Sequence, residues 1–241
     1  MKKKIFIMGF SILLLITVFL SGCVSKQYDY GGSPSNTQGR VLFTLADKAV
    51  NTSSVSSVEV TVDKVEAHTQ EDSWITVLNA QKTYDLLKLK TSGNQVLLAD
   101  VQLDPGTYNQ VRLTISKVMI TDSNGTHEAK LPSGVLKINT DLTVQANTTS
   151  TFMFDFLLDE SLHTTGNGLY IMAPVIQAES REDAQVDATD ENDVEVKGGR
   201  VKSSVKVGMD VNGNVDVGLK IAKDAKLTIG TDDKVKLGLG L

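Results

Sequence analysis

Residues 103–115 have the sequence LDPGTYNQVRLTI, and this stretch decides the fold class. Pro105 fixes φ and Gly106 accepts a positive φ, so the pair predicts a type II turn. A long strand is expected beyond the turn, because the apolar residues 111, 113 and 115 alternate with polar ones, the period of a half-buried strand. The alternation changes phase after Ile115, which predicts a β-bulge near Ser116 and Lys117.

The same period extends outward from this stretch, over residues 40–178 of the 241-residue chain. Short alternating runs separated by turns, with no long helical period between them, predict an all-β domain, an antiparallel β-sandwich. We place about ten strands, with a hairpin turn at Asn124-Gly125. The expected strands cover residues 41–45, 58–68, 74–78, 84–89, 96–103, 108–118, 128–131, 135–138, 142–144, 151–158 and 169–175. The leucine pairs within 84–89 and 96–103 could instead belong to a short helical turn.

The N-terminus predicts a location outside the cytoplasm. Three lysines precede an uncharged apolar run, Ile5–Leu20, and the sequence Leu20-Ser21-Gly22-Cys23 resembles the lipobox of prokaryotic lipoproteins. We therefore expect residues 1–22 to be a signal peptide and Cys23, the one cysteine of the chain, to carry lipid. Two acyl chains would hold the protein stably on a cell membrane. An uncleaved anchor, or a plain signal peptide with a bystander cysteine, is the alternative.

Three further segments are expected around the sandwich. Residues 23–39 are polar and rich in glycine, and predict a lipidated tether. Residues 179–195 hold eight acidic residues against one arginine, and predict a solvated acidic linker; their spacing does not fit a calcium loop. Residues 196–241 have apolar residues at odd positions and a turn at Asn212-Gly213, and predict a β-hairpin tail. Its apolar face would dock on the sandwich, self-associate or bind a partner.

Four stretches of this sequence resemble a prokaryotic family, the domain of unknown function 4382, which is common in surface lipoproteins. They are Val60–His68, Leu103–Leu113, Thr165–Tyr170 and Pro174–Ile176. The Pro-Gly-x-Tyr turn is also similar to that of transthyretin-like and carboxypeptidase-regulatory-like sandwiches. The resemblance implies the fold, and it implies no activity.

Residues that could perform chemistry are scattered. His68, His127 and His163 show no metal-ligand spacing, and no nucleophile motif is present. Asp155 and Asp159-Glu160 could imitate a pair of glycosidase carboxylates, although solvated carboxylates explain them better. We therefore expect no enzyme activity, no metal and no cofactor. The formal charge of −5 gives no reason to expect nucleic acid as a partner.

The remaining candidates point to a surface protein. Trp74, accompanied by Tyr84, Tyr108 and Tyr170, could stack on a sugar, or could pack in the core. Sequons begin at Asn51, Asn124 and Asn147, which would be glycosylation sites in a host that uses them. We expect a non-catalytic, lipid-anchored envelope protein whose sandwich binds or scaffolds an envelope polysaccharide or a protein, with a carbohydrate-processing enzyme as the weaker alternative.

Overall fold

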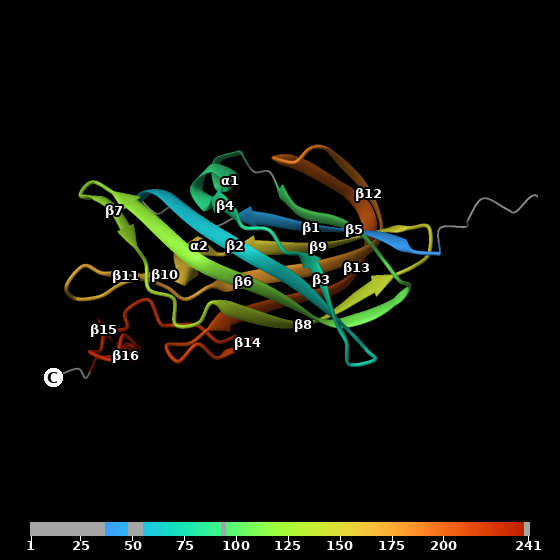
Figure 1. Cartoon of the computed structure of the whole chain (residues 1–241). Helices are drawn as coiled ribbons and strands as arrows, with labels where there is room; N and C mark the ends of the chain where they lie inside the picture. Colours follow the sequence, from blue (N-terminus) through green and yellow to red (C-terminus); the bar gives the residue numbers. More distant parts are fainter. Residues whose placement is uncertain (1–36, 48–54, 93–94, 239–241) are drawn as a thin grey trace, which may run out of the picture. The chain divides into compact units, whose positions relative to one another are not determined.

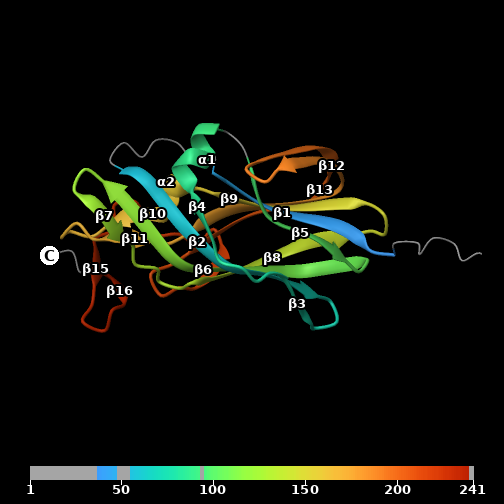
Figure 2. The same cartoon turned by 45° about the horizontal axis from the view of Figure 1, so that its top comes forward.

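The computed structural model describes residues 37–47, 55–92 and 95–238. The predicted signal peptide, most of the tether, Cys23 and the sequon at Asn51 lie outside the described residues. The described residues all belong to one compact unit, Asn36–Leu241. The all-β prediction is confirmed, since two large sheets lie face to face (Figures 1 and 2). No helix in the described ranges has the length and apolar character needed to cross a membrane.

Sheet A has six strands. In order across the sheet they are β14 (Val215–Val217), β13 (Asp193–Met209), β12 (Val175–Asp190), β9 (Thr149–Phe156), β1 (Gly39–Asp47) and β5 (Val96–Leu103). Neighbouring strands are antiparallel except β1 and β9, which run parallel. The predicted antiparallel sandwich therefore contains one parallel pair.

Sheet B is built on two long paired strands, β2 (Val55–Thr69) and β6 (Gly106–Asp122). Along β2 lie β3 (Trp74–Leu78) and β4 (Lys82–Asp85), and along β6 lie β7 (Gly125–Glu128) and β8 (Val135–Val144). The predicted bulge is present, because the register passes from Lys117 to Ile115 and skips Ser116. The predicted type II turn is wrong in its geometry: φ of Gly106 is 158°, near extended backbone, and Gly106 already pairs with Val144.

Small elements close the ends of the sandwich. They are α1 (Leu86–Ser92), α2 (Leu158–Ser161), the pair β10 (Leu162–Thr164) and β11 (Tyr170–Met172), and the pair β15 (Leu227–Ile229) and β16 (Val235–Leu237). The core between the sheets comes from alternate strand residues, as the period predicts. Phe152 and Phe154 are fully buried there, with ring centroids 4.9 Å apart in an edge-to-face arrangement.

The predicted acidic linker, residues 179–195, is wrong. These residues form most of β12 and the start of β13, which pair along their length. The basic residues that follow in β13 neutralise the acidic ones: Arg200 donates from Nε to Glu182 over 2.6 Å. Composition alone could not show this pairing, since the compensating charges lie on the next strand.

The long β12–β13 hairpin bends back over sheet A. Asp183, Gly198 and Gly199 have positive φ, and a Cβ on Gly199 would lie 2.8 Å from the carbonyl oxygen of Glu182. Its tip reaches the far edge strand β5, where Val194 donates a backbone hydrogen bond of 2.8 Å to Gln95 (Figure 1).

The C-terminal segment is part of the same unit. The predicted turns at Asn212-Gly213 and at residues 231–234 are both present, but the first joins the long core strand β13 to β14. Part of the apolar face docks on the sandwich, which is one of the three expected outcomes, and Val205, Val211 and Val215 pack partly buried against the same core. The buried residues are Val207, Met209, Ile221, Leu227 and Val235. Lys220 and Lys223 also form ion pairs with Glu160 and Asp159 of α2.

Candidate ligand-binding surface

The outer face of sheet B carries a row of aromatic and amide side chains. Trp74 of β3 pairs with His68 of β2, His68 with Gln110 of β6, and Gln110 with Asn139 of β8. Paired residues project on the same face of a sheet, so these four side chains lie in line across four strands. Gln110 donates from Nε2 to Oδ1 of Asn139 over 2.7 Å.

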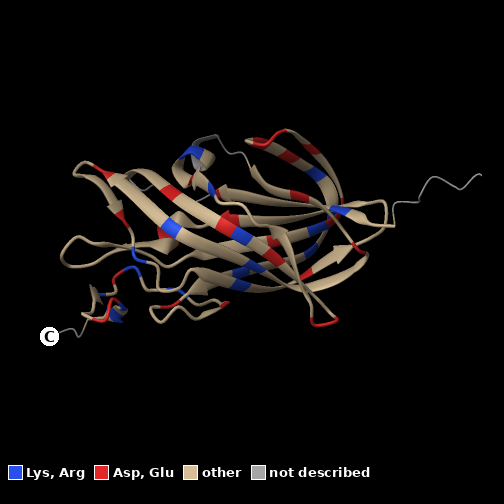
Figure 3. Ribbon diagram, in the orientation of Figure 1, with Lys and Arg blue, Asp and Glu red and all other residues tan. Residues whose placement is uncertain are grey.

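A charged row lies beside the first. Thr76, Glu66, Arg112 and Lys137 are paired in the same order across β3, β2, β6 and β8. Glu66 is buried and accepts a hydrogen bond of 3.0 Å from Lys64 and one of 3.4 Å from Arg112. Figure 3, in the orientation of Figure 1, shows acidic and basic residues close together along the middle of β2.

Trp74 joins the two rows. The guanidinium carbon of Arg112 lies 3.8 Å from the centre of the Trp74 ring, a cation–π contact. The ring of His68 lies 4.6 Å from the ring of Trp74, and its Nδ1 and Nε2 are 3.0 Å and 3.2 Å from Asn109 and Asp72. These contacts hold the half-buried indole in one place on an otherwise polar face, an arrangement that can stack against a ring and hydrogen-bond its substituents.

Of the two expectations for Tyr84, Tyr108 and Tyr170, packing within the fold is the one that the structure supports. Tyr108 is buried and donates to the carbonyl of Asp104, and Tyr170 donates to Asp122 over 2.8 Å. Tyr84 donates to the carbonyl of Leu97, and burial raises its pKa to about 12. These contacts hold the fold together, so Trp74 stands apart from them.

The three histidines lie in three different surroundings. His68 lies in the surface just described, whereas His127 on β7 lies 3.3 Å from Asp122. His163 on β10 is buried, and desolvation lowers its pKa. Among the described residues, no group of three or more His, Cys, Asp and Glu side chains is placed to hold a metal ion.

The candidate glycosidase carboxylates are buried or form ion pairs within the fold. Asp155 is 4% exposed in β9, between β1 and β12. Asp159 pairs with Lys223, and Glu160 with Lys206 and Lys220, whose hydrogen bonds lower the pKa of Glu160. The sequons at Asn124 and Asn147 lie at exposed turns, between β6 and β7 and between β8 and β9.

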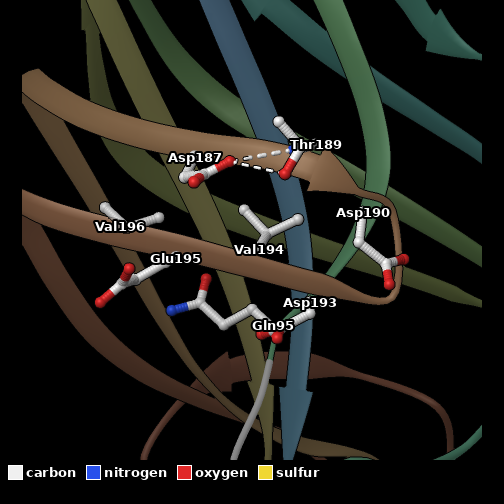
Figure 4. A pocket seen from close by; sticks show the side chains of 8 residues that line it. All are labelled: Gln95, Asp187, Thr189, Asp190, Asp193, Val194, Glu195 and Val196. Carbon is white, nitrogen blue, oxygen red and sulfur yellow. Dashed lines mark hydrogen bonds between the residues drawn. The ribbon is translucent and has the colours of Figure 1, made fainter.

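A hollow lies beneath the β12–β13 hairpin, with a volume of about 550 Å³ (Figure 4). Its walls include the carboxylates of Asp187, Asp190, Asp193 and Glu195. Asp187 is turned toward Thr189, which donates from its backbone N–H and its hydroxyl over 3.1 and 2.9 Å. Asp187, Asp190 and Glu195 point in different directions, so they do not converge on one point.

The fold and this surface define a β-sandwich domain with one sheet face that carries polar and aromatic side chains. The chain belongs to the family described as Domain of unknown function (DUF4382), whose model matches residues 38–174 and so confirms the resemblance seen in the sequence. No curated protein matches the chain, and no solved structure does. The family match ends one residue before β12, so the hairpin that completes sheet A lies outside it.

Sequence reasoning singled out Trp74 as a residue that could stack on a sugar, and considered His68 only as a metal ligand. It missed Gln110, Arg112, Lys137 and Asn139. The signal was present, since Gln110 and Arg112 are the polar positions of the alternation that predicted the strand. Those positions define an outer face as directly as the apolar ones define a core. The partner strands could not be known, because residues 135–144 are far from residues 106–115 in sequence.

Proposed function

We propose that this chain is a non-catalytic, lipid-anchored binding module of the cell envelope, which holds an extracytoplasmic glycan on the outer face of sheet B. The observation that carries the binding role is the Trp74–Arg112–His68 cluster with the amides of Gln110 and Asn139 in line beside it. Aromatic rings and paired amides are the side chains that bind the faces and hydroxyls of sugars.

The anchor is supported by the sequence alone. The basic start, the apolar run and the lipobox at residues 20–23 occur in the order that lipidation requires. Residues 24–38 would then join the lipid to β1, a reach of about 50 Å when fully extended. A sandwich tethered at this distance can meet a polymer of the envelope while remaining on the membrane.

The non-catalytic part of the proposal is supported by the use of the acidic residues. Asp159 and Glu160, the accessible members of the candidate pair, are engaged by three lysines of the C-terminal segment. The hydrogen bonds from Lys206 and Lys220 lower the pKa of Glu160, so this carboxylate stays charged and is a poor general acid.

Two experiments test this proposal. Labelling of growing cells with an alkyne fatty acid is expected to mark the wild-type chain and not the Cys23→Ser variant, and an unlabelled, soluble wild-type chain would refute the anchor. On a glycan array, we expect the purified chain to bind, and Trp74→Ala to lose the signal. His127→Ala is the matched control, because His127 lies on β7, away from the two rows. Absence of binding to every glycan would refute the binding role.

Self-association through the C-terminal segment stays a prediction. Val217 and Leu237 remain 63% and 61% exposed, although five apolar residues of the segment are buried. Sedimentation equilibrium of the purified chain tests it.

A further inference from the structure

The two rows of sheet B bring like charges together. Arg112 and Lys137 are direct cross-strand partners on β6 and β8, with their side chains on the same face. Like charges placed directly opposite each other destabilise a sheet. Lys137 is exposed and has no ion-pair partner in the described part of the chain. The pair therefore costs stability in the free protein.

The guanidinium of Arg112 is also poorly satisfied. Among the described residues, its hydrogen bond to Glu66 is the one it donates, and that bond is long at 3.4 Å. Its Nε is buried without a partner. A guanidinium has five N–H donors in a planar fork that suits carboxylate and phosphate oxygens. Its contact with Trp74 fixes the plane of this fork before any ligand arrives.

The local charge balance differs from that of the whole chain. Three cations, Lys64, Arg112 and Lys137, lie around the buried carboxylate of Glu66. The carboxylate of Asp63, next to Lys64 on β2, accepts hydrogen bonds from Gln81 and Ser116. The chain as a whole has a formal charge of −5. Asp72 lies at the rim, where it pairs with His68. Arg112 and Lys137 thus present two adjacent cations, which attract an anion by their local field.

The face lacks the character of a protein-docking surface. The exposed large apolar side chains of the described residues are Leu169, Val201, Val217 and Leu237, and none of them lies on sheet B. Protein interfaces bury an apolar centre, whereas this face offers one indole among amides and charges.

We infer that the ligand of this face is an anionic polysaccharide. A sugar ring would lie against Trp74 and the amides of Gln110 and Asn139, and the carboxylate or phosphate of the polymer would lie between Arg112 and Lys137. The anion would relieve the like-charge pair and supply acceptors to the guanidinium. This inference rests on the proposed function and names its ligand class.

The test is calorimetric binding of three polymers to the purified chain: polygalacturonate, its fully methyl-esterified form, and a yeast phosphomannan. Polygalacturonate and its ester share a backbone and differ in charge. We expect at least one anionic polymer to bind about tenfold or more tightly than the ester. Its affinity should fall as the salt concentration rises. Tighter binding of polygalacturonate than of phosphomannan would identify carboxylate as the anionic group of the ligand, and tighter binding of phosphomannan would identify phosphate.

The variants Lys137→Gln and Lys117→Gln each remove one positive charge from an exposed position of sheet B. We expect Lys137→Gln to weaken binding of the preferred polymer about fivefold, the effect of one surface ion pair, and Lys117→Gln to change it less than twofold. Equal affinity for the charged and esterified polymers, or equal effects of the two variants, would overturn the inference and leave a neutral-glycan function standing. Absence of binding to these polymers and to the glycan array would refute the proposed function as well.

Discussion

The substitution Met209→Ala tests whether the C-terminal strands belong to the core of the sandwich. Met209 lies at the end of β13, is 0% exposed and packs in the same cluster as the residues of β1 and β2. It lies 35 residues beyond the end of the family match at residue 174. Its effect on stability therefore reports on a part of the fold that the family description does not cover.

The expected loss is large. Truncation of a fully buried methionine to alanine costs about 2–5 kcal/mol, from lost transfer free energy and from the cavity left behind. With a urea dependence of about 2 kcal/mol/M, a loss of about 3 kcal/mol lowers the midpoint of unfolding by about 1.5 M. Val201→Ala is the matched control on the same strand, because Val201 is 43% exposed. It should cost less than about 1 kcal/mol.

The assay is urea unfolding of the purified chain, followed by far-ultraviolet circular dichroism and by tryptophan fluorescence. Trp74, the single tryptophan, lies on sheet B, while Met209 lies on sheet A. We expect both signals to report one transition and to shift together in Met209→Ala. Equal midpoints for Met209→Ala and the wild type, or a fluorescence transition that does not move, would show that β13 is not part of the common core.

Two further predictions concern β12 and β13. The hydrogen bond from Arg200 lowers the pKa of Glu182 below its ordinary 4.5. This carboxylate therefore stabilises the fold above pH 4.5 and stops doing so as the pH falls through its lowered pKa. The melting temperature of Glu182→Gln should fall less steeply below pH 4.5 than that of the wild type, and parallel profiles would contradict this. A Cβ on Gly208 would collide with the carbonyl of Leu219, so Gly208→Ala should displace the segment after β14 and speed tryptic cleavage after Lys220. An unchanged cleavage rate would show that this segment does not pack on Gly208.

Several strands of both sheets could be predicted closely from the sequence, but not all of them. Residues 84–89, expected as a strand, form the end of β4 and the start of α1, and β7 ends at Glu128, where a strand over 128–131 was expected to begin. The alternation of residues 108–115 and the change of phase near Ser116 define β6 and its bulge, because both depend on local side-chain period. Residues 74–78 and 96–103 match β3 and β5 to the residue. Local patterns of this kind are sufficient wherever one face of a strand is buried and the other is solvated.

The acidic stretch from Glu179 to Glu195 could not be predicted by composition. Its charge is balanced by residues such as Arg200, which face it only after β13 has paired with β12. The candidate surface could not be predicted from the sequence for the same reason. Gln110 and Arg112 are local, but Asn139 and Lys137 come beside them through pairing of β6 with β8. Long-range register brings such groups together, and no local period encodes it.

The most direct test of the account is the emission of Trp74 during titration of the purified chain with polygalacturonate. Because Trp74 is the single tryptophan and lies in contact with Arg112, its fluorescence reports on the proposed surface alone. The account predicts an emission change that saturates along the same curve as the heat of binding and that is weakened in Lys137→Gln. Heat of binding with an unchanged emission would place the ligand elsewhere on the molecule and contradict the assignment of the outer face of sheet B.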